Sequence, residues 1–165
     1  MENKKDLLQK AKEYAFLLLK FRLRSEKEIY QRLKKKKFTE EIIRETLSFL
    51  RDKGFIDDNL FAKAWVASRI KRPLGLRKIR GELNLKGIDK EIIDSQINEI
   101  KKGYSEPDLV KKIIKDKLRK LKGIEPQKAK RRIYAYLLYR GFSPEVVIDT
   151  LSQLAQIHTD YPAHS

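Results

Sequence analysis

The stretch SEKEIYQRLKKKKFTEEIIRETLSFL at residues 25–50 decides the fold, because two later stretches repeat its pattern. They read GLRKIRGELNLKGIDKEIIDSQINEI at 75–100 and AKRRIYAYLLYRGFSPEVVIDTLSQL at 129–154, at offsets of 50 and then 54 residues. Self-similarity at such a period is typical of proteins built from stacked helical units. Seven aligned positions are apolar in all three copies: Ile29/Ile79/Ile133, Leu33/Leu83/Leu137, Phe38/Ile88/Phe142, Ile42/Ile92/Val146, Ile43/Ile93/Val147, Leu47/Ile97/Leu151 and Leu50/Ile100/Leu154.

The apolar positions within each copy follow helical spacing. Ile29 and Leu33 are four residues apart, and Ile43, Leu47 and Leu50 follow an i, i+4, i+7 pattern. Each copy therefore predicts a helix, a short turn and a second helix.

The turn between these two helices carries its own signals. Gly87 and Gly141 stand where the first helix should end, a position at which glycine adopts left-handed backbone at low cost. The first copy has Lys37 there, so we expect its turn to differ or to cost more. The second helix then starts on an N-cap residue, which is Thr39, Asp89 or Ser143.

A further helix is expected before each pair, over roughly 4–20, 58–71 and 107–121. Units of this size bury too little apolar surface alone, so neighbouring units must stack. The predicted fold is all-α, an elongated array of three tandem three-helix repeats with about nine helices. We expect the repeats to cover residues 1–54, 55–104 and 105–155, followed by a disordered tail at 156–165.

Composition excludes several classes of protein. The 165 residues contain no cysteine, which excludes disulfides, Cys-ligated zinc and thiol catalysis. The first residues are polar and include acids, unlike a signal peptide, and the run YAFLLL is too short to span a bilayer. We therefore expect a cytoplasmic protein with no membrane partner.

Positive charge is spread along the whole chain. The net charge of +16 divides into +7 for residues 1–54, +4 for 55–104 and +5 for 105–165. This spread favours a surface that faces a polyanion, either nucleic acid or an acidic protein groove. The plainer alternative is a soluble protein with a generally basic surface.

Three blocks of the sequence resemble the RecX family of bacterial regulators of the RecA recombinase. FIDDNLFAKAWVASR at 55–69 resembles the family signature, and GLRKIRGELNLKGI at 75–88 and RSEKEIYQRLKKKKF at 24–38 resemble two other blocks. The resemblance covers roughly residues 10–155. The sequence departs from the family pattern at Lys37, which replaces a glycine, at the aromatic Trp65, and in a less characteristic third repeat.

The resemblance implies an all-helical protein that binds the RecA nucleoprotein filament. Such proteins lie in the helical groove of the filament and limit its growth, strand exchange, ATPase and stimulated repressor cleavage, and some also bind DNA. It further implies no catalytic activity and no cofactor. We expect a monomer that binds the filament, with single- or double-stranded DNA as a further candidate partner. The alternatives are a stand-alone basic helical-repeat protein that binds nucleic acid, and a protein-binding scaffold that contacts no polyanion.

The adjacent acids of the signature have a structural interpretation and two functional ones. Asp57 is expected to cap a helix whose first residue is Asp58. The functional alternatives are contact with a basic patch on a partner and a metal site, for which two adjacent aspartates are too few ligands. Trp65 is expected in a core, although it is also a candidate for stacking on a base. The signature positions interpreted as structural are Asp57, Asp58, Phe61, Ala62, Trp65 and Gly87.

Basic residues are the better candidates for a binding surface. The turn at Pro73–Gly75 is expected to bring the cations on its two sides into one patch. Phosphate contacts would make binding fall steeply with salt, whereas a merely solvated charge would not. The candidate partner- or DNA-binding residues are Lys34, Lys35, Lys36, Arg69, Lys71, Arg72, Arg77, Lys78, Arg80, Arg131, Arg132 and Arg140.

Nothing in the sequence indicates catalysis. Both histidines, His158 and His164, lie in the tail without a nucleophile or acid at triad spacing. The phosphate-binding pattern GxxxxGK is absent from the sequence. We therefore expect no enzyme activity and no metal site.

Overall fold

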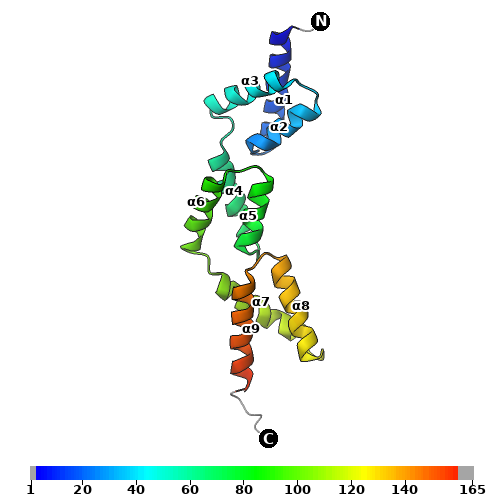
Figure 1. The fold of residues 1–165 in the computed structure, drawn as a ribbon, viewed down its shortest axis with the longest axis vertical. Helices are drawn as coiled ribbons and strands as arrows, with labels where there is room; N and C mark the ends of the chain where they lie inside the picture. The colour runs from blue at the N-terminus through cyan, green and yellow to red at the C-terminus, as the bar shows by residue number, and fades with distance from the viewer. Residues whose placement is uncertain (1–2, 160–165) are drawn as a thin grey trace. The chain divides into compact units, whose positions relative to one another are not determined.

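The computed structural model describes residues 3–159, and the side chains of residues 3–154, as nine α-helices without a strand (Figure 1). The all-α fold with three groups of three helices is therefore confirmed. The helices are α1 (Lys4–Phe21), α2 (Glu26–Lys35), α3 (Glu40–Asp52), α4 (Asp58–Arg69), α5 (Leu76–Leu85), α6 (Lys90–Lys101), α7 (Glu106–Lys120), α8 (Pro126–Tyr139) and α9 (Pro144–Thr159).

Side chains at the helix starts satisfy the first backbone amides. Ser25 and Glu28 form a capping box at the start of α2, in which each side chain accepts the backbone N–H of the other residue. Thr39 and Ser143 accept N–H groups in the first turns of α3 and α9. A helix start leaves such amides without an intrahelical partner, so each cap stabilises the helix that follows it.

The turn after the middle helix has the same backbone conformation in all three repeats. Gly87 and Gly141 have φ of 76° and 86°, and Lys37 has φ of 64°. The sequence left two alternatives for Lys37, a different turn or a more costly one. The structure shows the same turn as in the other repeats, which excludes the first alternative. The first repeat therefore carries the cost of a side chain in left-handed backbone.

The chain divides into two compact units, to both of which the second repeat contributes. Unit 1 contains Met1–Ala67 and Glu82–Gln96, and unit 2 contains Ser68–Gly81 and Ile97–Ser165. The division follows contacts, whereas the expected repeat boundaries follow the order of helices along the chain. Those boundaries and the elongated shape stay predictions.

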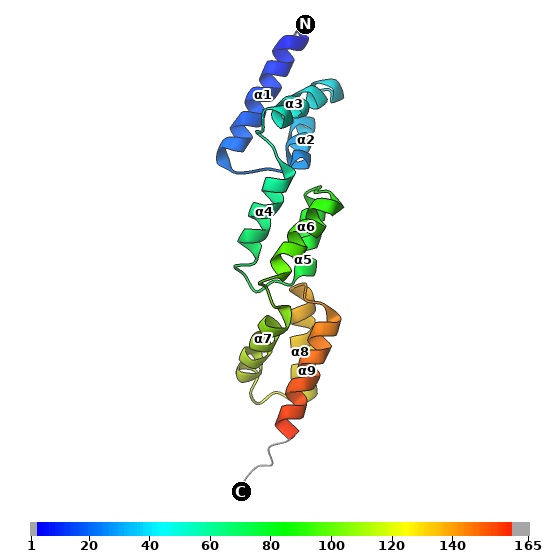
Figure 2. The ribbon, with the colours of Figure 1, turned by 90° about the vertical axis from the view of Figure 1, so that its left-hand side faces the viewer.

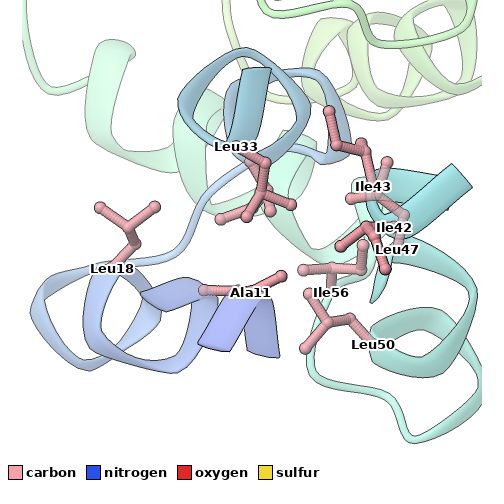
Figure 3. Packing of buried hydrophobic residues seen from close by; sticks show 10 residues of the cluster. Ala11, Leu18, Leu33, Ile42, Ile43, Leu47, Leu50 and Ile56 are labelled. Atoms are coloured by element: carbon pink, nitrogen blue, oxygen red, sulfur yellow. The ribbon is translucent and has the colours of Figure 1, made fainter. Parts of the chain in front are cut away.

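The core of unit 1 lies where α1, α2 and α3 contact one another. Figure 3 shows Ala11 of α1, Leu33 of α2 and Leu47 of α3 pointing toward a common interior. Six of the seven aligned apolar positions of the first repeat are buried, and Phe38 is half-buried at the edge of the core. Each fully buried side chain of this kind contributes roughly 1.5–3 kcal/mol, so the repeated pattern supplies most of the stabilisation.

The core of unit 2 is built in the same way from α7, α8 and α9, which contact one another. Figure 2 shows α8 beside α9 in this unit. Five of the buried residues are aligned apolar positions of the third repeat, and α7 adds two more. The cluster contains Val110, Ile114, Ile133, Leu137, Phe142, Val147 and Leu154.

The last helix continues further than the sequence pattern indicates. We expect a tail without structure from residue 156, whereas α9 extends to Thr159. Helix-favouring residue types follow the last apolar position of the repeat, so no sequence signal ends the helix there. Residues 160–165, including His164, and the side chain of His158 lie outside the described part of the chain.

Candidate polyanion-binding surface

Positive charge is concentrated in unit 2. This unit has 20 Lys and Arg against 8 Asp and Glu, a net charge of +12, whereas unit 1 has 19 against 15, a net charge of +4. Six of the cations of unit 2 lie in Ser68–Gly81, which contains no acid. We call Ser68–Gly81 the basic segment. The even spread of charge along the sequence therefore becomes an uneven one in the fold.

The candidate basic residues are divided between the units. Lys34, Lys35 and Lys36 are exposed at the end of α2 in unit 1. Unit 2 contains the other nine, of which six belong to the basic segment: Arg69, Lys71, Arg72, Arg77, Lys78, Arg80, Arg131, Arg132 and Arg140. The Lys34–Lys36 run therefore belongs to a different unit from the larger set.

Unit 1 contains the first joint, where the start of α2 meets the turn between α5 and α6. Ser25 Oγ donates to the Lys86 carbonyl at 2.7 Å, and Lys86 Nζ donates to Glu28 Oε1 at 2.6 Å. A Cβ on Gly87 would lie 2.7 Å from the Cβ of Lys27. Glycine is therefore required at this turn for a steric reason as well as for its left-handed backbone.

Glu28 receives hydrogen bonds from three donors in the first joint. Arg22 Nη2 donates to it at 2.9 Å, in addition to Lys86 Nζ and the Ser25 N–H. Burial raises the pKa of the Glu28 carboxyl, but these hydrogen bonds outweigh burial and hold the pKa at about 2. The carboxylate is therefore ionised at neutral pH and offsets the cations around it.

Unit 2 contains the second joint, where the start of α5 meets the turn between α8 and α9. The Gly75 N–H donates to the Arg140 carbonyl at 2.9 Å, and Arg140 Nε donates to the Pro73 carbonyl at 3.1 Å. A Cβ on Gly75 would lie 2.1 Å from the carbonyl carbon of Gly141, and one on Gly141 would lie 2.3 Å from the Cβ of Lys78. The two backbones therefore approach as closely as glycine allows.

The two joints are equivalent in the repeat alignment. Gly75 stands 50 residues after Ser25, and Arg140 stands 54 residues after Lys86, which are the offsets between the repeats. In each joint the first of these residues donates a hydrogen bond to the carbonyl of the second. The carbonyl of the turn residue is therefore the acceptor in both joints, while the donor is the Ser25 hydroxyl in the first and the Gly75 backbone N–H in the second.

Further hydrogen bonds hold the basic segment in unit 2. The Tyr104 hydroxyl donates to the Leu74 carbonyl at 2.6 Å, and the Leu76 N–H donates to Glu106 Oε1 at 2.7 Å. Burial of the Tyr104 hydroxyl raises its pKa. These contacts fix the backbone on which the cations of the segment are carried.

Tyrosines lie among the cations of the second joint. Lys78 Nζ is 4.5 Å from the ring centroid of Tyr139. The ring of Tyr136 has Lys117 Nζ at 3.9 Å and Arg140 Cζ at 5.7 Å from its centroid. Cations at these distances are attracted to the ring face. Sequence reasoning missed these tyrosines, although the run IYAYLLYR at 133–140 placed three of them in a basic helix.

The acid pair of the signature lies at a helix start in unit 1. Asp57 Oδ1 accepts the N–H groups of Asn59 and Leu60 at 2.8 and 3.1 Å, the geometry of an N-cap. Asp58 is the first residue of α4, and its Oδ1 accepts the Glu26 N–H at 2.9 Å, so it also caps α2. Burial raises the pKa of the Asp58 carboxyl. One adjacent pair thus stabilises two helix starts.

The aromatic residues of α4 pack within unit 1. Phe61 and Ala62 are buried, and Phe61 stacks on Trp65 with the ring centroids 5.6 Å apart. Trp65 Nε1 donates to Glu82 Oε2 at 2.8 Å, and Lys86 Nζ lies 5.0 Å from the Trp65 ring centroid. This geometry favours the interpretation of Trp65 as a packed residue over that of a base-stacking one.

The described part of the chain has neither a cluster of metal ligands nor a membrane-spanning helix. No group of three His, Asp or Glu side chains among the described residues is arranged to hold a metal ion. None of the described helices has the length and apolar character needed to cross a bilayer.

Family models match all three repeats of the chain. The first, second and third three-helix domains of RecX match residues 11–50, 57–95 and 104–151. A Regulatory protein RecX from Chlorobium phaeobacteroides (strain BS1) is 39% identical over 147 residues, which are 88% of this chain and 94% of the relative. One from Mycobacterium sp. (strain KMS) is 34% identical over 87% of this chain and 81% of the relative.

Solved structures show the same fold. The crystal structure of RecX from Lactobacillus salivarius has a TM-score of 0.78 to this chain at 21% identity, and it covers 92% of this chain and 99% of that one. A second crystal structure, of a regulatory protein RecX, has a TM-score of 0.76 and covers 88% of this chain. Because sequence relatives, all three domain models and the fold agree, the chain belongs to the RecX family.

Proposed function

We propose that this chain regulates the RecA recombinase, mainly negatively, by binding in the groove of the RecA–DNA filament. Binding there would limit filament extension, strand exchange, ATPase activity and the coprotease function. Membership of the RecX family over most of the chain carries this proposal. The relatives are named regulatory proteins, and the proposal assigns the chain no catalytic activity of its own.

Charge supports a partner that contains nucleic acid. The net +12 of unit 2 and the acid-free basic segment suit a filament whose DNA repeats a negative charge at every phosphate. We propose that the twelve candidate cations form the contact surface. Two units joined in one chain contact the filament together, which raises the overall affinity above that of either alone.

The mechanism is steric and thermodynamic. A protein lodged in the groove obstructs entry of a second DNA or of a repressor. A protein bound across the growing end shifts the balance of the filament toward disassembly. We propose that the chain acts as a cytoplasmic monomer in DNA repair, recombination and the SOS response.

The test is ATP hydrolysis by RecA on single-stranded DNA, with this protein titrated into the reaction. We expect hydrolysis to fall as protein is added. The quadruple variant Arg69→Ala, Arg72→Ala, Arg77→Ala and Arg80→Ala should inhibit less, since it removes four charges from the basic segment. Unchanged hydrolysis at saturating wild-type protein would contradict the proposal.

A matched control removes the same charge from unit 1. Lys5, Lys20, Lys63 and Lys90 are exposed and lie outside the candidate set. Changing these four to Ala should leave inhibition close to that of the wild type. If both quadruple variants lose inhibition equally, overall charge rather than the basic segment determines binding. Thermal unfolding of each variant checks that it is folded.

The second candidate function is stand-alone binding of nucleic acid, which the concentration of charge in unit 2 favours. A fluorescence anisotropy titration separates the two. Tight, salt-sensitive binding to DNA without RecA supports the second candidate. Weak binding to DNA alone with tight binding to the filament supports the first.

A further inference from the structure

We propose that the second joint is a nucleotide-binding site for single-stranded DNA, in which Tyr139 stacks on an unpaired base while Lys78 and Arg140 contact the phosphates beside it. This inference rests on the second candidate function and deepens it, because it names the residues of one site and the form of nucleic acid that the site takes. Three observations carry it: the charge of the joint, the exposure of the tyrosine, and the contrast with the first joint.

The contrast between the joints concerns one pair of aligned side chains. In the first joint these are Glu28 and Lys86, which form an ion pair at 2.6 Å. At the aligned positions, 50 and 54 residues later, the second joint has Lys78 and Arg140. The carbonyl of the turn residue accepts a hydrogen bond in both joints, from the Ser25 hydroxyl in the first and from the Gly75 N–H in the second, while the acid is replaced by a base. The fold alone does not require two cations at these positions, because the first joint forms with an acid and a base that neutralise each other.

The cations of the second joint are not neutralised by an acid. Within residues 3–154, neither Lys78 nor Arg140 forms an ion pair with a carboxylate. The nearby acid Glu106 accepts the Leu76 N–H, and Glu145 lies at the start of α9, where hydrogen bonds from its own backbone N–H and from Ser143 lower its pKa. Both carboxylates are therefore engaged by helix starts, so the two cations of the joint keep a net attraction for phosphate.

Tyr139, the tyrosine of the second joint, is exposed, so packing in the core does not account for a large aromatic ring at this position. Tyr139 is 76% exposed at the end of α8, and its ring has Lys78 Nζ 4.5 Å from the centroid. Tyr136, one turn earlier, is half-buried between Lys117 and Arg140. Tyr139 thus offers a large ring surface to solvent beside positive charge. Single-strand-binding proteins combine aromatic rings with a basic track in this way.

Single-stranded DNA fits these features better than an acidic protein segment does. A carboxylate would be satisfied by the cations alone and would leave the exposed ring unused. A nucleotide uses both, because its base has a flat face and its phosphates carry charge. The six cations of the basic segment continue the positive surface from the same joint. Duplex DNA leaves no unpaired base for the ring.

The first experiment measures anisotropy of a labelled thymidine oligomer of about 15 nucleotides, against an abasic oligomer of the same length, without RecA. Tyr139→Ala should weaken binding of the thymidine oligomer roughly 5- to 100-fold, the range for loss of one stacked base. It should leave binding of the abasic oligomer unchanged. Tyr139→Phe keeps the ring and should bind both oligomers like the wild type.

The second experiment converts the second joint into the chemistry of the first. Lys78→Glu places a carboxylate opposite Arg140, as Glu28 stands opposite Lys86. We expect this variant to unfold at the wild-type temperature or above and to lose at least tenfold in affinity for both oligomers. Lys78→Met, which removes charge without adding an acid, should lose less. The control is Tyr30→Ala. Tyr30 also has a lysine beside its ring, with Lys34 Nζ 5.5 Å from the ring centroid, but it differs from Tyr139 in that its hydroxyl donates to an acid, Glu40.

Several outcomes would overturn the site. They are wild-type protein that does not bind the thymidine oligomer, Tyr139→Ala protein that binds it normally, and Tyr139→Ala protein that loses both oligomers equally. Variants that retain oligomer affinity but lose the RecA filament would assign the joint to protein contact instead. Failure here leaves the RecA ATPase titration unaffected, so the two proposals are tested separately.

Discussion

The two joints occupy equivalent positions in the repeat but differ in the charge of their side chains. In both, a helix start meets the turn of the following repeat, and a glycine in that turn permits the approach. The first joint closes around a half-buried ion pair between Lys86 and Glu28, whereas the second places Lys78 and Arg140 at the aligned positions. The repeat therefore keeps the close approach between helix start and turn while the side chains around it diverge. The unit with the second joint is also the one with most of the net charge.

The largest expected effect comes from blocking the closest backbone approach. Gly75→Ala should destabilise the protein by roughly 3 kcal/mol, because the added Cβ would lie 2.1 Å from the main chain of Gly141 and one of the two backbones would have to shift. Chemical denaturation monitored by circular dichroism measures the change. The matched control is Gly81→Ala in α5, where a Cβ meets nothing within 4 Å, so this variant should gain about 0.5–1 kcal/mol. Equal effects of both variants would mean that the second joint does not limit stability.

The next largest effect comes from removing the ion pair of the first joint while leaving the hydrogen bond from Ser25 to the Lys86 carbonyl in place. Glu28→Gln keeps the capping box but removes the charge, and it should cost about 2 kcal/mol at pH 7. Because the folded pKa of Glu28, about 2, lies below its ordinary value of 4.5, its stabilisation is fully present above pH 4.5. It is lost as the pH falls toward 2. The free energies of unfolding of wild type and variant should therefore converge in acid.

An exposed ion pair provides the control for Glu28. Glu41 pairs with Lys4 at 2.7 Å on the surface of unit 1, where solvent screens the attraction. Glu41→Gln should leave stability nearly unchanged over the same pH range. A pH-independent difference between wild type and Glu28→Gln would show that the charge of Glu28 contributes little.

The smallest effect tests why one repeat tolerates a lysine in its turn. Lys37 is exposed and lies at neither joint, whereas Gly87 and Gly141 each meet a lysine of the preceding repeat. Lys37→Gly should therefore stabilise the protein by about 0.5–1 kcal/mol, by relieving left-handed backbone alone. The neighbouring Lys36, with φ of −79°, is the control, and Lys36→Gly should bring no gain. A shift in the midpoint of thermal unfolding measures both.

Local signals predicted the helices and their ends well. The spacing of Ile29 and Leu33, the Ser25 cap and the glycine at 87 each act within one or two turns, so the residues that matter are neighbours in the sequence. The end of α9 was the main error, because helix-favouring residues follow the repeat and no stop signal marks its limit. The sequence identified the basic candidates by residue type, but it did not show that they are divided between two units.

The sequence by itself determined the all-α fold, the three repeats, the buried faces and the excess of positive charge. These depend on periodicity and composition, which are readable along the chain. Only the tertiary structure decided which charges are neutralised, because Glu28 and Lys86 are 58 residues apart and their pairing depends on how consecutive repeats meet. It also placed an exposed Tyr139 beside Lys78, from two helices that no local pattern connects. Long-range contacts depend on which residues the packing brings together, and at the two joints those residues differ in charge.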